Sequence, residues 1–184
     1  MDWLKNNHKK LLLIGIDGCG GAGKSTLAEH MMTISEKGTV IHMDDFYLPS
    51  SRRVHPPDIG GHFDWKRMRD QVLEPLFQKR SACYQRYDWD NDKLAEWHDV
   101  PPFGVIVIEG CYATRDELRH FYDYTVWVDC PRELRLKRGL ERDGEEALSF
   151  WLDWMEQEDR YQDNQRPRTK VDWVIDGSEK IETK

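Results

Sequence analysis

Residues 11–30 read LLLIGIDGCGGAGKSTLAEH, and this stretch decides the fold. The apolar run at 11–16 is typical of a strand that is buried on both faces. Residues 18–25, GCGGAGKS, match the phosphate-binding pattern G-x-x-x-x-G-K-[ST]. Residues 26 to about 35 continue as a predicted helix, with Leu27, Ala28, Met31 and Met32 on one face. The order of strand, glycine-rich loop and helix favours a polyphosphate-binding loop over an ordinary turn.

The residue types in this loop suit a polyphosphate ligand. Small residues let several backbone N–H groups converge on phosphate oxygens, and the N-terminus of the following helix adds its positive dipole end. Lys24 can reach the β- and γ-phosphates, and the Ser25 hydroxyl can ligate Mg²⁺. We therefore expect the nucleotide to contact Gly18, Cys19, Gly20, Gly21, Ala22, Gly23, Lys24, Ser25 and Thr26.

Composition narrows the class of protein. The 184 residues predict a single domain spanning 1–184. A net charge of −7 argues against a protein that binds nucleic acid or an anionic membrane, so we expect a small-molecule partner. The sequence has no membrane-length apolar run, its start lacks a signal-peptide pattern, and its four cysteines are scattered, which together predict a cytoplasmic protein.

Further apolar runs alternate with helical patterns along the chain. Strands are predicted at 39–43, 104–108, 124–128 and 171–175, and helices at 65–79, 116–121, 131–142 and 145–162. Asp64 is expected to cap the first of these helices, Pro75 to kink it or end it early, and a short hairpin to form around 84–89. In the last helix the predicted inward-facing residues are Ala147, Leu148, Trp151, Trp154 and Met155. The alternation predicts a three-layer α/β fold of the P-loop NTPase class, with a parallel sheet of about five strands.

Acidic residues follow two of the predicted strands. Asp44 and Asp45 come after the strand at 39–43, and Glu109 follows the strand at 104–108. Right-handed crossovers place the carboxyl ends of parallel strands at one edge, so Asp44 and Glu109 should converge with Lys24. Asp44 is the expected general base, with Asp45 nearer a metal ion or its waters and Glu109 at the Mg²⁺ site. A purely structural role is the alternative in each case: Asp44 and Asp45 could both cap a turn, and Glu109 could be an ordinary carboxylate at the end of a strand.

Two other groups of residues admit both a functional and a structural interpretation. Arg135, Arg138 and Arg142 share one helix face before Asp143-Gly144, which fits either a solvated basic face or a mobile lid at about 138–150. The stretches HFD and RYDW combine aromatic rings with carboxylates that could hold sugar hydroxyls or could simply be core and cap residues. The substrate-binding candidates are Asp45, Tyr47, His62, Asp64, Arg86, Tyr87 and Asp88.

Six motifs, taken in their order along the chain, resemble the uridine kinase-like family of P-loop kinases. They are GCGGAGKST, MDDFYLP, HFDW, RYDW, VIVIEGCYA and RLKRGLERDG. That branch also contains nicotinamide riboside kinase, pantothenate kinase and phosphoribulokinase. The resemblance implies ATP and Mg²⁺ as cofactors and phosphoryl transfer to a primary hydroxyl, first of all the 5′-hydroxyl of a nucleoside such as uridine. It also implies that Asp44 is the base, that Glu109 belongs to the Mg²⁺ site, that Arg138 and Arg142 are lid arginines, and that Tyr87 and Asp88 face the nucleoside. We expect the metal ion to lie between Ser25, Asp44 and Glu109.

Two departures from the family pattern leave the acceptor open. PPDIGGHFDW keeps only the end of the longer NFDHPDAFD stretch, and Gly144-Glu145-Glu146 stands where RGR often follows the lid. The segment 47–102 is the expected acceptor-binding excursion. The alternative acceptors are nicotinamide riboside, pantothenate, a sugar or a hydroxy acid. A nucleotide-dependent switch ATPase is the alternative from another class.

Overall fold

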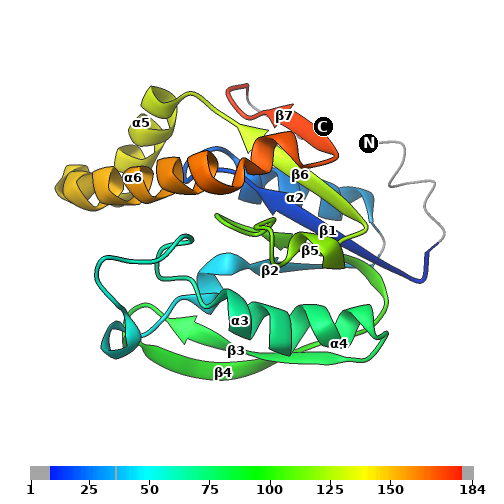
Figure 1. The fold of residues 1–184 in the computed structure, drawn as a ribbon. Coiled ribbons are helices and arrows are strands. Elements are labelled where there is room, and N and C mark those ends of the chain that lie inside the picture. The colour runs from blue at the N-terminus through cyan, green and yellow to red at the C-terminus, as the bar shows by residue number, and fades with distance from the viewer. Residues whose placement is uncertain (1–8, 36, 180–184) are drawn as a thin grey trace.

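A five-stranded parallel sheet forms the centre of the molecule (Figure 1). The computed structural model describes residues 9–35 and 37–179. The strand order is β2-β5-β1-β6-β7. The bounds are β1 Leu11–Asp17, β2 Gly38–His42, β5 Gly104–Glu109, β6 Tyr124–Asp129 and β7 Trp173–Asp176. All five predicted strands are therefore confirmed, each within two residues of its predicted limits.

Helices cover both faces of this sheet, because side chains of successive strand residues point to opposite faces. In β1, Leu12 and Ile14 pack in one apolar cluster with Leu27 of α2 (Lys24–Ile34). Leu13 packs in another cluster with Met68 of α3 (Trp65–Met68). Figure 1 shows α2 and the α3–α4 segment on opposite sides of the sheet. This arrangement confirms the predicted three-layer α/β fold.

The predicted helix at 65–79 is one helical segment with an irregular centre. It consists of α3, a π-helical turn at Arg69–Leu73 and α4 (Glu74–Phe77). The Asp64 carboxylate accepts a hydrogen bond from the Arg67 amide, which confirms the predicted cap. The helix does not end at Pro75. The π-helical turn ends at Leu73, two residues before Pro75, which lacks an N–H, and the chain stays helical to Phe77.

The excursion forms an antiparallel hairpin beside the main sheet. Strands β3 (Ala82–Asp88) and β4 (Lys93–Val100) pair over a longer range than the predicted turn region, with an irregularity between Gln85 and Tyr87. By contrast, the predicted helix at 116–121 is only a short 3-10 turn at Arg119–Phe121. Its sequence, DELRHF, is too short to propagate an α-helix without a longer packed face.

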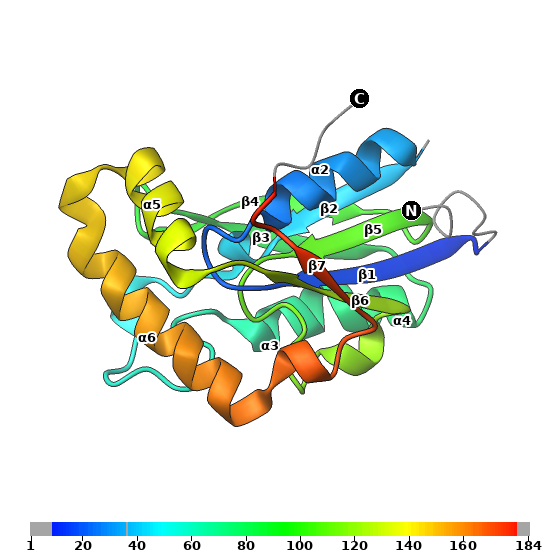
Figure 2. The same cartoon turned by 90° about the horizontal axis from the view of Figure 1, so that it is seen from above.

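The last two long helices are α5 (Arg132–Asp143) and α6 (Leu148–Gln165). Trp151 and Met155 of α6 are buried as predicted, but Leu148 is 40% exposed, so its predicted inward position is wrong. The first turn of α6 lies next to α5 (Figure 2), where Trp151 packs against Gly139 of α5 and Leu148 faces solvent. In the described residues, 9–35 and 37–179, we find no helix with the length and apolarity that a membrane span requires.

Candidate functional site

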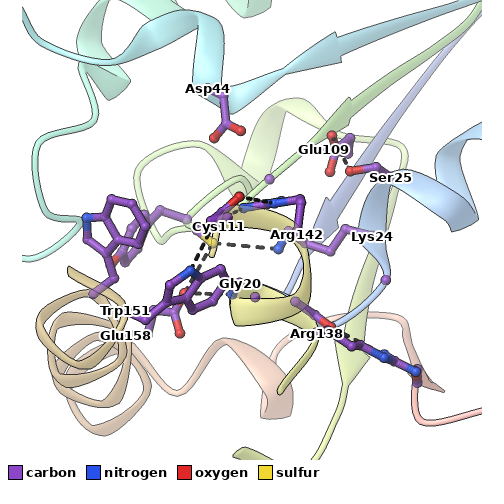
Figure 3. A pocket seen from close by; sticks show the side chains of 18 of the residues that line it. Gly20, Lys24, Ser25, Asp44, Glu109, Cys111, Arg138, Arg142, Trp151 and Glu158 are labelled. Atoms are coloured by element: carbon purple, nitrogen blue, oxygen red, sulfur yellow. Dashed lines mark hydrogen bonds and ion pairs between the residues drawn. The ribbon is translucent and has the colours of Figure 1, made fainter. Parts of the chain in front are cut away.

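A cavity of about 930 Å³ opens at the carboxyl edge of the sheet. The phosphate-binding loop, the ends of β2 and β5, the loop before α3, and helices α5 and α6 all contribute to its wall. Figure 3 shows Lys24, Ser25, Asp44 and Glu109 around the same space. The predicted convergence of strand-end residues therefore occurs.

The phosphate-binding loop forms one end of the cavity. Of the nine predicted loop residues, six line it: Gly20, Gly21, Gly23, Lys24, Ser25 and Thr26. Gly21 has a φ of +74°, and a Cβ there would lie 2.6 Å from the Arg135 carbonyl oxygen, so both conformation and space require glycine. The Lys24 ammonium donates to the Cys19 carbonyl at 2.9 Å. Burial alone would lower the pKa of Lys24, but the surrounding carboxylates, including Glu109 and Glu158, raise it, so the ammonium stays charged.

Glu109 is the centre of a hydrogen-bonded group at the end of β5. Its Oε1 accepts from the Ser25 hydroxyl at 3.1 Å and lies 2.6 Å from Nδ1 of His42. His42 ends β2 and pairs with Glu109 in the sheet register, which brings the two side chains together. Burial would raise the pKa of Glu109, but the His42 hydrogen bond and the Lys24 charge hold it below its ordinary value. Glu109 is therefore an anion at neutral pH.

Asp44 and Asp45 point in different directions from the 3-10 turn Met43–Phe46. Asp44 lines the cavity, whereas Asp45 accepts a hydrogen bond from the Tyr84 hydroxyl at 2.9 Å and does not line it. Asp44 is an exposed residue that lines the cavity, and partial desolvation there, together with the negative charge of Glu109, raises its pKa. A carboxylate with a raised proton affinity is suited to accept a proton.

The residues around Glu109 fit a magnesium ion. The carboxylates of Asp44 and Glu109 and the hydroxyl of Ser25 offer hard oxygen ligands, the type that Mg²⁺ prefers. The raised pKa of Asp44 beside Glu109 shows a repulsion that a divalent cation would relieve. Within residues 9–35 and 37–179 no group of three or more His, Cys, Asp or Glu side chains could hold a metal ion. The ion would therefore need phosphate oxygens or water to complete its coordination.

The two predicted lid arginines have different surroundings. Arg138 donates to the carbonyl oxygens of Gly21 at 3.2 Å, Gly177 at 2.8 Å and Ser178 at 3.1 Å. It thereby ties the phosphate-binding loop to the segment after β7, and Figure 3 shows it directed away from Asp44. Arg142 is exposed, donates to the adjacent Asp143 at 2.7 and 2.9 Å, and lies over the Trp151 ring, 5.7 Å from its centroid. In contrast to Arg138, it makes no hydrogen bond to the phosphate-binding loop among the described residues, so it is the arginine better placed to turn toward a phosphoryl group.

Aromatic side chains form the other end of the cavity. Tyr47 packs against Trp89 with ring centroids 4.6 Å apart, and Trp154 also lines the cavity. Phe63 and His62 complete this wall. Burial, together with the positive charges of His55 and Arg53, lowers the pKa of His62, so the imidazole is neutral at neutral pH.

Five of the seven substrate-binding candidates do not line the cavity: Asp45, Asp64, Arg86, Tyr87 and Asp88. Arg86 pairs with Glu96 at 2.6 Å, and Asp88 accepts hydrogen bonds from the turn at Asp90 and Asn91. Their predicted contact with a substrate has no geometric support here, because sequence proximity to aromatic residues does not fix the direction of a strand side chain.

Tyr87 lies behind the aromatic wall rather than in it. Its ring contacts those of Tyr47 and Trp89, with centroids 5.8 and 5.1 Å away. Its hydroxyl donates to Asp92 at 2.6 Å and accepts from Arg53 at 2.8 Å. The side chain therefore supports the wall from outside the cavity.

Glu158 and Gln157 line the cavity but were not among the predicted site residues. Glu158 is 5% exposed. The signal was present in the sequence, because Trp151, Met155 and Glu158 follow the helical spacing of an inward face. A carboxylate on an apolar stripe indicates a buried polar contact.

Comparisons with known proteins agree with this geometry. A family model described as "Phosphoribulokinase / Uridine kinase family" matches residues 59–147. A uridine kinase of Ureaplasma parvum is 30% identical over 148 residues, which cover 74% of this chain and 71% of that protein. A uridine kinase of Mycoplasma pneumoniae is 26% identical, covering 96% of this chain and 90% of the relative. The structure of a possible uridine kinase from Bacillus stearothermophilus superimposes with a TM-score of 0.71 at 25% identity, covering 95% and 96% of the two chains.

Proposed function

We propose that this chain, which belongs to the phosphoribulokinase/uridine kinase family, transfers the γ-phosphoryl group of ATP to the 5′-hydroxyl of a nucleoside, with uridine the first candidate. The family membership makes it a phosphotransferase with an alcohol acceptor. The nucleotide and the acceptor are the proposed part. One observation carries the proposal: Lys24, Ser25, Asp44 and Glu109 line a single cavity whose far end is aromatic.

In this mechanism, Asp44 is the general base. The acceptor hydroxyl lies between the Asp44 carboxylate and the γ-phosphorus, and Asp44 accepts its proton as the new O–P bond forms. The bond from the γ-phosphorus to the bridging oxygen breaks, and ADP leaves with that electron pair. Lys24 and Arg142 neutralise the negative charge that develops on the phosphoryl oxygens. Arg138 keeps the phosphate-binding loop in shape through its three carbonyl contacts.

Ser25, Glu109 and Asp44 would hold Mg²⁺, which when bound draws negative charge from the phosphates. Ser25 and Glu109 are already 3.1 Å apart, so little rearrangement is required of them. The His42 hydrogen bond keeps Glu109 ionised and oriented toward Ser25.

Charge in the cavity supports an acceptor without an anionic group. Among the described residues, the cationic side chains that line the cavity are Lys24, Arg138 and Arg142, all at the nucleotide end. Each arginine behind the aromatic wall has its own carboxylate partner: Arg53 with Asp92, Arg67 with Asp64 and Arg115 with Glu117. A buried carboxylate or phosphate of an acceptor would lack a partner, which is costly. Among the alternative acceptors, uridine, nicotinamide riboside and an uncharged sugar therefore fit better than pantothenate or a hydroxy acid.

ADP release with Mg-ATP tests this function across a panel of nucleosides, nicotinamide riboside, pantothenate and small sugars, with a no-acceptor control. Stimulation by a neutral nucleoside, with phosphate recovered on its 5′-oxygen, supports the proposal. Stimulation by an anionic acceptor alone would overturn the acceptor assignment. Slow hydrolysis that no acceptor stimulates would favour the switch ATPase.

A further inference from the structure

The Glu158 carboxylate contacts the phosphate-binding loop directly. Its Oε1 accepts the Gly20 backbone N–H at 2.6 Å, and its Oε2 accepts from Nη1 of Arg135 at 2.9 Å. The Cys111 thiol lies 3.4 Å from Oε1. Glu158 is 5% exposed and its partner Arg135 is 4% exposed, so the pair is buried. Figure 3 shows the Glu158 side chain beside Gly20, at the border of the cavity.

These contacts are those expected of a phosphate oxygen. A phosphate-binding loop works because its backbone N–H groups point at an anion, and a carboxylate and a phosphate oxygen satisfy such a donor in the same way. Here one of the cavity-lining N–H groups already has an anionic partner from the chain itself. A bound triphosphate would bring several negative charges to the loop that holds this buried carboxylate.

We propose that Glu158 is an internal competitor of the nucleotide: its carboxylate occupies the position of a phosphate oxygen at Gly20 and limits the affinity for polyphosphate. Nucleotide binding then transfers the Gly20 N–H from Glu158 to a phosphate oxygen. This inference rests on the proposed nucleotide site, and it adds a residue that determines how tightly that site binds.

The place of Glu158 on α6 gives this exchange a second effect. Trp154 and Gln157, on the same helix, line the cavity beyond the phosphate-binding loop. Tyr161 and Gln162 also bond residues at the start of the loop, Asp17 and Cys19, at 2.8 and 3.4 Å. The phosphate site and the acceptor end of the cavity thus share one helix, so a movement of α6 would act on both.

The test is a titration of Glu158→Gln with adenosine, ADP and ATP in the presence of Mg²⁺. Glutamine keeps the size of the side chain and can still accept a hydrogen bond, but it removes the negative charge. We expect ATP and ADP to bind about tenfold more tightly than to the unaltered chain, the size of a modest charge repulsion in a partly buried site. Adenosine, which has no phosphate, should bind equally to both proteins.

Glu156→Gln is the matched control, because Glu156 is an exposed residue of the same helix and the substitution makes the same change in net charge. The Glu156→Gln variant should bind ATP and ADP no more tightly than the unaltered chain. Glu158→Asp, which withdraws the carboxylate by one methylene group, should shift the affinity in the same direction and serves if the glutamine variant does not fold. Equal ATP affinity in Glu158→Gln and Glu156→Gln, or an equal gain for adenosine, overturns the inference. Failure of the unaltered chain and every variant to bind ATP would refute the nucleotide site itself.

Discussion

Replacing Asp44 with asparagine removes the proposed base and leaves the phosphate-binding loop untouched. Asp44 lines the cavity from a turn after β2 and makes no hydrogen bond to the loop among the described residues. Loss of a positioned general base costs about 10²–10⁴ in rate, so we expect kcat to fall by that factor. Because burial and the Glu109 charge already disfavour the Asp44 anion, neutral asparagine should not lower the melting temperature.

The assay is steady-state ADP release with the acceptor found in the panel, together with a separate titration of ATP binding. ATP affinity should change far less than kcat, because Lys24 and the loop N–H groups remain. Asp45→Asn is the control, since Asp45 bonds Tyr84 and does not line the cavity. A kcat of Asp44→Asn within tenfold of the unaltered enzyme would refute the assignment. If kcat falls by this factor in Asp45→Asn and not in Asp44→Asn, the general base is Asp45.

Four further outcomes are expected. Lys24→Ala should cost about 3 kcal/mol of transition-state stabilisation, measured as kcat/KM, and near-normal turnover would contradict the loop assignment. The value of kcat/KM should fall as the pH drops through the raised pKa of Asp44, because the base must be ionised; an acidic limb at or below the ordinary aspartate value of 3.8 would contradict this. Gly139→Ala should cost about 1–3 kcal/mol in urea denaturation, because its Cβ would lie 2.3 Å from the Trp151 ring; an unchanged midpoint would show that α6 yields freely. Tyr87→Phe should lose about 1 kcal/mol of stability with an unchanged acceptor KM, whereas a raised KM would place Tyr87 against the acceptor.

The sheet and the residues at the phosphate-binding-loop end of the cavity could be predicted from the sequence alone. Local signals suffice there, because an apolar run followed by GCGGAGKS specifies strand, loop and helix within consecutive residues. The parallel topology then requires that strand ends share one edge, so Asp44 and Glu109 could be placed near Lys24 before any contact was known. The same reasoning could not tell Asp44 from Asp45, since both sit in one turn.

The side chains of the aromatic end of the cavity, and the contacts that hold the phosphate-binding loop, could be identified only from the packing of distant segments. The RYDW stretch supplies Trp89 to the cavity wall but turns Tyr87 and Asp88 away from it, a result of the register of β3 and of the bulge after Gln85. Glu158 meets Gly20 across 138 residues of sequence. Such contacts depend on how α6 packs against the end of the sheet, and the spacing of residues within one helix carries no information about its distant partner.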